Sequence, residues 1–206
     1  MKKIAVFASG RGSNFAAIWE QVKLGSIQAQ VMCVLSDQVH PPVFDIAQTH
    51  QIPTHWVNRK QFSDAADYAQ FLIDLLESYG VELIILAGYL KLIPAPVVAR
   101  FRNAIVNIHP ALLPNFGGKG YYGLKVHEAV IRSGVKITGV TVHFVDEHYD
   151  QGQVIVQEQV AVLANDTPET LARRVLEVEH RLYPEVVRAI CNEEILNKNG
   201  KVIWQR

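Results

Sequence analysis

The sequence is short of three things: net charge, cysteine and long apolar runs. Lysine and arginine number 20, as do aspartate and glutamate, so no overall field draws the chain to nucleic acid or an anionic membrane. Only two cysteines, Cys33 and Cys191, are present, which excludes a disulfide-stapled scaffold and fits reduced thiols. No apolar run is long enough to span a membrane, and Met1-Lys2-Lys3 leads directly into a predicted strand rather than a signal segment. We therefore expect a cytoplasmic protein without a membrane partner.

What the sequence has is enough apolar content for one substantial core. Hydrophobic residues make up 49% of 206 positions, and no low-complexity linker or internal repeat divides them. The first half alternates short apolar runs with helical patterns, which is typical of βαβ units and a parallel sheet. After Pro114 the pattern changes to two β-branched stretches and a long helix. The sequence therefore predicts a single α/β domain over 1–206, with a mainly parallel twisted sheet, helices on both faces and an antiparallel edge in the C-terminal half.

The predicted elements follow from these periodicities. The expected strands are Ile4–Ala8, Val31–Leu35, Thr54–Val57, Leu83–Ala87, Ala104–Ile108, Val135–Val145 and Gln153–Val162. The expected helices are Asn14–Leu24, Pro42–His50, Asp64–Tyr79, Pro96–Phe101, Gly123–Arg132 and a long one from the cap at Thr167 to about Cys191. We expect Ser13 and Asp64 to be N-caps, and Ile195–Trp204 to form a short hairpin around Asn199-Gly200.

The stretch Asn107–Pro114 carries the clearest chemical signal. It follows an apolar run, and Asn107 and His109 are two residues apart, so their side chains leave one face of an extended backbone. Pro110 ends the strand there. An amide and an imidazole at the carboxyl end of a parallel strand suit a ligand site, since Asn donates to a developing oxyanion and His moves protons near neutral pH. The alternative is a strand end whose polar groups satisfy only local backbone.

A second signal is the segment Ser9–Asn14, Ser-Gly-Arg-Gly-Ser-Asn, between the first strand and the first helix. Free N–H groups at a helix N-terminus, reached closely past glycine, suit a phosphate. Phe15 stands where the dinucleotide pattern needs a third glycine, which favours a single phosphate over a pyrophosphate. A simple strand–helix turn capped by Ser13 is the other interpretation.

Two carboxylates stand out in the second half. Asp150 lies in the polar loop 146–152 between two predicted strands, where it could raise the pKa of His109 and hold its tautomer, or merely form a turn. Glu179 falls inside the apolar arc of the long helix, so it needs donors from a ligand or an internal salt bridge.

The remaining histidines give no metal signal. His127, His143 and His148 are loosely spaced and match no ligand pattern, so we predict no metal site.

Five segments in this order resemble the phosphoribosylglycinamide formyltransferase family, over Lys3 to about Arg188. They are Gly10–Asn14, Leu86–Ile93, Asn107–Pro114, Gly139–Val145 and Tyr149–Gly152. The resemblance implies transfer of a formyl group from 10-formyltetrahydrofolate, a co-substrate, to the amine of glycinamide ribonucleotide in purine biosynthesis. It also implies a nucleotide-binding half, 1–103, and a catalytic and folate-binding half, 104–206.

The resemblance also implies roles for individual residues, carried onto matching positions only. The catalytic residues would be Asn107, His109 and Asp150; the ribonucleotide would be bound by Gly12, Ser13, Asn14 and Glu179; and the folate would be bound by Leu90, Lys91, Leu92, Ile93, Asn107, Asp146 and Asp150. In this interpretation protonated His109 and Asn107 stabilise the formyl oxygen, and Asp150 keeps His109 cationic.

The chain departs from the family at three places. Lys91 stands where Arg is common, and Ala65 aligns with an Arg of some members, for which Arg59 or Lys60 could substitute. The loop Phe116–Tyr122 is richer in glycine than in many members.

Three other functions are open to such a sequence. A methionyl-tRNA formyltransferase would need a basic tRNA-binding domain, and a formyltetrahydrofolate deformylase would need a regulatory domain and no phosphate loop. A nucleotide-binding sensor would have no use for Asn107, His109 and Asp150 together. We expect small-molecule substrates, no nucleic acid, and a monomer or homodimer.

Overall fold

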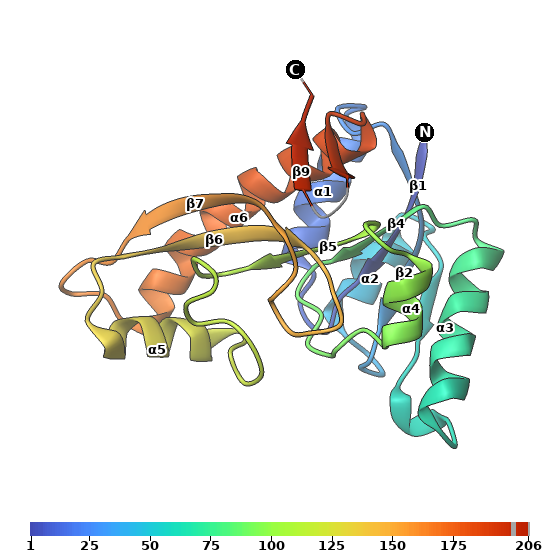
Figure 1. The fold of residues 1–206 in the computed structure, drawn as a ribbon, viewed down its shortest axis with the longest axis horizontal. Helices are drawn as coiled ribbons and strands as arrows, with labels where there is room; N and C mark the ends of the chain where they lie inside the picture. The colour runs from blue at the N-terminus through green and yellow to red at the C-terminus, as the bar shows by residue number, and fades with distance from the viewer. Residues whose placement is uncertain (199–200, 206) are drawn as a thin grey trace.

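The fold is built around one seven-stranded mixed sheet (Figure 1). The computed structural model describes residues 1–198 and 201–205. In chain order the strands of this sheet are β1 (Lys2–Phe7), β2 (Ala29–Ser36), β3 (Thr54–Trp56), β4 (Leu83–Leu86), β5 (Ile105–His109), β6 (Ile137–Phe144) and β7 (Val154–Ala161). Across the sheet they run β3-β2-β1-β4-β5-β6-β7. The pairs among β1 to β5 are parallel, whereas β5–β6 and β6–β7 are antiparallel. The predicted antiparallel edge in the C-terminal half is confirmed.

Helices cover both faces of the sheet, as predicted. They are α1 (Ser13–Lys23), α2 (Pro42–Thr49), α3 (Ala65–Ser78), α4 (Ala95–Arg100), α5 (Leu124–Ser133) and α6 (Pro168–Cys191), with a short 3₁₀ turn, η1 (Arg59–Gln61), before α3. Buried residues of α1, α2, α5 and α6 share one apolar core, while those of α3 and α4 form another on the opposite face. In Figure 1, α3 and α4 lie together at the right and α5 lies beside β6 and β7 at the left.

The strand order fixes where a ligand can bind. From β1 the chain proceeds outward through β2 and β3, and then returns to place β4 and β5 on the other side of β1. In open α/β sheets the loops leaving the two strands at such a reversal diverge and leave a crevice at their carboxyl ends. The loops after β1 and β4 begin side by side, since the Ser9 N–H donates to the Gly88 carbonyl at 3.1 Å.

Two of the three predicted helix caps are confirmed and one is wrong. The Asp64 side chain accepts from the Asp67 N–H at 2.8 Å, and Thr167 forms a reciprocal capping box with Thr170. Ser13 is instead the first residue of α1, because the cap position is taken by Gly12 with φ +77° and no side-chain hydrogen bond. A side chain at Gly12 would also meet Val43, its Cβ lying 2.5 Å from Cγ2. The loop therefore needs glycine at the cap position.

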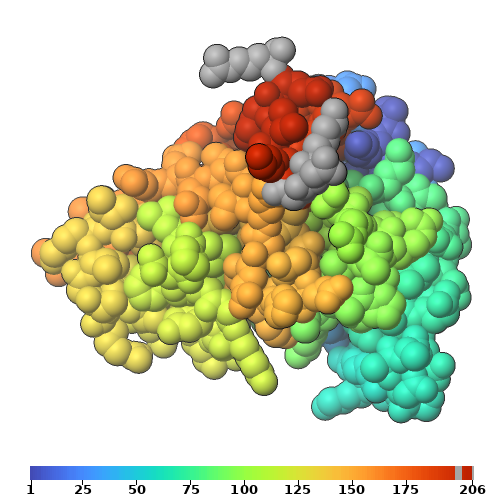
Figure 2. Space-filling model, in the orientation of Figure 1, coloured from blue at the N-terminus to red at the C-terminus, as the bar shows by residue number. Residues whose placement is uncertain are grey.

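The predicted C-terminal hairpin is present as β8 (Ile195–Lys198) and β9 (Lys201–Trp204). Its predicted turn, Asn199-Gly200, lies outside the described residues. In Figure 2 the yellow-green loop between β5 and α5 projects from the lower edge, and a notch separates it from the cyan segment before α3. Among the described helices, none combines the length and the apolar character that crossing a membrane requires.

Candidate functional site

A cavity of about 670 Å³ lies at the carboxyl ends of β1, β4 and β5. Its walls come from the loops after these strands, from α5 and α6, and from the loop between β6 and β7. The predicted site residues that line it are Gly12, Ser13, Asn14, Leu90, Asn107, His109, Asp150 and Glu179. A cavity of this size, lined by convergent polar groups, suits a small-molecule ligand.

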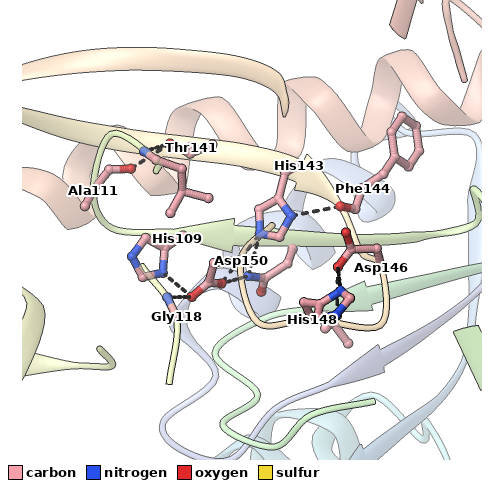
Figure 3. Close-up of polar contacts among 12 residues, drawn as sticks. His109, Ala111, Gly118, Thr141, His143, Phe144, Asp146, His148 and Asp150 are labelled. Atoms are coloured by element: carbon pink, nitrogen blue, oxygen red, sulfur yellow. Dashed lines mark hydrogen bonds and ion pairs between the residues drawn. The ribbon is translucent and has the colours of Figure 1, made fainter. Parts of the chain in front are cut away.

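Three predicted catalytic residues meet at one wall of this cavity. Asp150 lies between His109 and His143 in Figure 3, with Oδ2 3.6 Å from His109 Nδ1 and Oδ1 3.7 Å from His143 Nε2. Asn107 Nδ2 donates to Asp150 Oδ1 at 3.4 Å. The antiparallel pairing of β5 with β6 brings Asn107 opposite His143. The sheet and the 146–152 loop thus bring the three residues together as the sequence predicted.

His109 departs from the prediction in its protonation. Its side chain is nearly enclosed, and burial lowers the pKa of His109 below the ordinary 6.5, with Asp150 and the Phe116 carbonyl offsetting this only in part. The expectation that Asp150 raises this pKa above 6.5 is therefore wrong, because desolvation outweighs the attraction of the carboxylate. The Phe116 carbonyl accepts from Nε2 at 2.8 Å, which places the proton of the neutral ring on Nε2.

Asp150 is ionised despite its burial. Burial by itself would raise the pKa of Asp150, but its contacts with His143 and His109, together with the Gly118 N–H, bring it below the ordinary value. The Gly118 N–H donates to Oδ2 at 2.9 Å. This contact explains the glycine-rich loop that the sequence left without an account, since Gly118 has φ +91° and Gly117 packs against Asp150.

The predicted phosphate loop opens α1 at the cavity. Gly12 offers no side chain to the first turn of the helix, so the N–H groups of that turn are free of a side-chain cap. Asn14 is buried, and its Oδ1 has no hydrogen-bond partner within the part of the chain that the structure describes. A first turn that faces a cavity and lacks a cap is suited to an anion.

Glu179 reaches the same cavity from α6. It is only 8% exposed, and its Oε2 accepts a hydrogen bond of 2.6 Å from Asn14 Nδ2. Burial raises the pKa of Glu179 to about 7, and Asn14 only partly offsets this. No ion pair to Glu179 is present among residues 1–198 and 201–205, so a salt bridge does not explain this carboxylate.

The segments predicted to bind folate lie close together, but their residues do not all line the same cavity. Leu92 N–H donates to the Tyr149 hydroxyl at 3.0 Å, which ties the segment after β4 to the 146–152 loop. Leu90 lines the main cavity, whereas Lys91 and Leu92 line a second one of about 270 Å³. Ile93 is buried in the core, and Asp146 lines neither cavity.

The second cavity contains one of the two proposed substitutes for the family arginine. Ala65 and Arg59 both line it, while Lys60 does not. Lys91 lies 3.7 Å from the buried Asp37 carboxylate on the same wall. Arg59 is therefore the substitute that this geometry favours.

Several residues of the main cavity were not predicted. Arg173 and His127 line it, and His143 completes the polar cluster behind Asn107. Arg173 could have been found from sequence, because Glu169, Arg173, Leu176 and Glu179 follow one helical face. His143 could not, since only the pairing of β5 with β6 places it beside Asn107. Among the described residues no group of three His, Cys, Asp or Glu side chains is arranged to hold a metal.

Comparison with known proteins agrees with this geometry. Residues 2–187 match the family model for formyl transferase. A phosphoribosylglycinamide formyltransferase of Bacillus subtilis is 38% identical over 98% of this chain and 99% of its own length. A chloroplastic one of Vigna unguiculata is 48% identical over 99% of this chain, which spans only 66% of that protein. The crystal structure of glycinamide ribonucleotide transformylase 1 from Symbiobacterium toebii, 35% identical, superposes with a TM-score of 0.92 over 100% of this chain and 95% of that one. The chain belongs to the formyl transferase family and, within it, to the phosphoribosylglycinamide formyltransferases.

Proposed function

We propose that this protein transfers the formyl group of 10-formyltetrahydrofolate to the amine of N1-(5-phospho-D-ribosyl)glycinamide, a step of de novo purine biosynthesis. One observation carries the proposal: a single cavity is lined both by Asn107, His109 and Asp150 and by an uncapped helix start beside Glu179. The first set suits acyl transfer to an amine, and the second suits a phosphorylated sugar. The family and its named members support the same reaction.

In the proposed mechanism neutral His109 is a base. The amine nitrogen forms a bond to the formyl carbon, and the carbonyl electron pair moves onto the formyl oxygen. The new C–N bond makes the nitrogen acidic, and His109 takes its proton. Asp150, already ionised, stabilises the imidazolium that results. The electron pair on the formyl oxygen then re-forms the carbonyl, the bond between the folate nitrogen and the formyl carbon breaks, and His109 gives its proton to that nitrogen.

A neutral histidine suits this sequence of steps better than a cationic one. A cation could not accept the proton that the amine must lose, whereas a ring with a lowered pKa begins in the accepting form. The attack creates a positive charge beside Asp150 and a negative charge on the formyl oxygen. Asp150 is already in place to stabilise the positive charge, so little reorganisation accompanies that part of the step.

The ribonucleotide would lie along α1 and α6. Its phosphate would accept hydrogen bonds from the first turn of α1 at Gly12, Ser13 and Asn14. The Glu179 carboxylate would accept from the ribose hydroxyls. Arg173, which is exposed on the wall of the same cavity, adds a positive charge near a dianionic group.

The folate would use the segment after β4 and the 146–152 loop. Leu90 and Leu92 are large, exposed apolar side chains, of the kind that pack on an aromatic ring system. Arg59 and Lys91 would face an acidic tail from the second cavity. The proposal includes a division into a nucleotide-binding half, 1–103, and a catalytic half, 104–206. Two assignments do not follow this division: Glu179 lies in the second half but would bind the ribonucleotide, and Leu90–Ile93 lie in the first half but would bind the folate.

The compartment and the assembly also stay proposals. Cys33 and Cys191 are free, which suits a reducing compartment such as the cytoplasm. A monomer or a homodimer is expected, acting on small molecules without nucleic acid.

A direct assay tests the function. Purified protein, 10-formyltetrahydrofolate and glycinamide ribonucleotide are mixed, and release of tetrahydrofolate is followed spectroscopically. We expect release that depends on the ribonucleotide. Release at the same rate with water as the only acceptor would identify a deformylase instead. Binding of the ribonucleotide without any release would identify a sensor.

A further inference from the structure

His143 lies behind the predicted catalytic residues and has no role in the mechanism above. It is 2% exposed on β6, and its Nδ1 is 2.9 Å from the Phe144 carbonyl oxygen (Figure 3). A carbonyl oxygen only accepts hydrogen bonds, so Nδ1 must carry a proton. In the neutral ring the other nitrogen, Nε2, is then an acceptor.

That acceptor determines how the amide of Asn107 is turned. Asn107 Nδ2 lies 3.1 Å from His143 Nε2 and 3.4 Å from Asp150 Oδ1. A carboxylate oxygen and an unprotonated imidazole nitrogen both require a donor, and the amide NH₂ has two hydrogens to give. The opposite orientation would set the amide oxygen against two acceptors. The orientation is therefore fixed by the protein before any ligand binds.

The amide oxygen of Asn107 is left for the ligand. It accepts no hydrogen bond among the described residues, and it is not enclosed in the way that Oδ1 of Asn14 is enclosed. Asn107 also lines the main cavity. An available acceptor beside His109 and Asp150 suits an N–H donor, and the attacking amine of the proposed reaction is such a donor.

We propose that His143 is a positioning residue that turns the Asn107 amide so that its oxygen binds the attacking amine. This inference rests on the proposed function, and it revises the expectation that Asn107 donates to the formyl oxygen. The amine nitrogen gains positive charge as its bond to the formyl carbon forms, so its hydrogen bond to the amide oxygen strengthens in the transition state. Interactions that strengthen in this way increase kcat rather than substrate affinity.

The tautomer can be measured without any substrate. Nitrogen-15 NMR of the ligand-free, full-length protein near neutral pH distinguishes the Nδ1–H ring, the Nε2–H ring and the cation. The signals of His143 are those missing from the spectrum of His143→Gln. We expect the Nδ1–H tautomer. An Nε2–H ring or a cation would present a donor to Asn107 and would overturn the inference, whatever reaction the enzyme performs.

Kinetics test the consequence for catalysis. Glutamine at 143 retains an acceptor oxygen, whereas leucine has none. We expect His143→Leu to lower kcat about tenfold with little change in the KM of the ribonucleotide, and His143→Gln to retain most of the activity. His55→Leu is the matched control, because His55 is half-buried, hydrogen-bonded to Tyr79 and lines neither cavity. Equal losses in the Gln and Leu variants would contradict the orienting role.

A double variant separates positioning from simple structural support. If His143 acts through Asn107, then His143→Leu should have little further effect on kcat once Asn107→Ala is present. Multiplicative losses would show that the two residues act independently, and the inference would fail. Absence of formyl transfer by the wild-type enzyme would instead refute the proposed function, and would leave the tautomer measurement standing.

Discussion

Two carboxylates, the buried Glu179 and the partly buried Asp150, line the same cavity and differ in the direction of their pKa shifts. Burial raises the pKa of Glu179 to about 7, because a single amide from Asn14 is its hydrogen-bond partner. Asp150 is also desolvated, yet its pKa is lowered, because two imidazole rings and the Gly118 N–H surround it. Burial acts in the same direction on both, and the polar groups that surround each carboxylate decide the outcome.

In the proposed mechanism this difference separates a residue that binds a ligand, Glu179, from one that takes part in the chemistry, Asp150. Asp150 receives its hydrogen bonds from the protein, so its charge is present before substrate arrives. Glu179 has few hydrogen-bond donors around it in the protein, and ribose hydroxyls could supply more. Its negative charge would therefore be better stabilised in the complex with the ribonucleotide. Changing one partner at a time tests whether this contrast holds.

The largest expected effect is on turnover in Asp150→Asn. The substitution keeps the shape and removes the charge that stabilises the His109 imidazolium, so kcat should fall by about ten-thousandfold, the loss typical of a carboxylate that supports a catalytic histidine. Ribonucleotide affinity, measured by calorimetry, should change little, because the phosphate and ribose contacts lie on α1 and α6. Asp74→Asn, on the exposed face of α3, is the control. Full turnover in Asp150→Asn would make Asp150 a turn residue only.

Ser13→Asp should have the next largest effect, on ribonucleotide affinity. A carboxylate in the uncapped first turn of α1 would take the N–H groups offered to the phosphate and repel its charge, weakening binding about a hundredfold. Folate affinity should be nearly unchanged. Ser26→Asp adds the same charge beyond the other end of α1 and should change neither affinity. Equal losses for both ligands would count against the phosphate assignment.

Glu179→Gln should have opposite effects on binding and on stability. Removing the charge-assisted acceptors should weaken ribonucleotide binding by about 1.5–3 kcal/mol. The ligand-free protein should become more stable above pH 7, by up to about 3 kcal/mol, since a carboxylate whose pKa rises from 4.5 to about 7 opposes folding when ionised.

The sign of that stability change follows from proton linkage. Folded Glu179 holds its proton more tightly than unfolded Glu179, so the wild-type protein should lose stability as pH rises from 4.5 to about 7. Glu179→Gln should lack this loss, and Glu177→Gln, exposed two residues earlier, should retain it. Denaturant unfolding at several pH values measures the difference. Unchanged ribonucleotide affinity with lowered stability would make Glu179 purely structural.

Much of the fold and part of the candidate site could be predicted from the sequence. Apolar runs separated by helical patterns indicated the parallel strands, and the β-branched stretches after Pro114 indicated the antiparallel edge. Glu179 stood out because a carboxylate on an apolar helical stripe violates a local rule. Asn107 and His109 stood out because they share a strand end. Each of these signals is local, so one sequence suffices to carry it.

What sequence did not provide depends on packing between distant segments. His143 meets Asn107 only through the pairing of β5 with β6, and Gly118 meets Asp150 only because the two loops fold together. Gly12 takes the cap position predicted for Ser13 because Val43 of α2 leaves no room for a side chain there. The direction of the His109 shift depends on how fully the ring is enclosed, and spacing does not report enclosure.

The smallest expected effect is a change in the pKa of His109. NMR titration of the ring in ligand-free enzyme should give a pKa below 6.5, because burial outweighs the attraction of Asp150. In Asp150→Asn the attraction is lost while burial is unchanged, so the pKa should fall further. The folded-state pKa is lowered, so the neutral base is present at all pH values above it and is lost only on acidification. Turnover of the wild-type enzyme should decline below the pKa of His109. In Asp150→Asn this decline should begin at a lower pH, in step with the lower pKa measured by NMR. A wild-type pKa above 6.5 would mean that Asp150 dominates the environment of His109, and would restore the cationic donor in place of the neutral base.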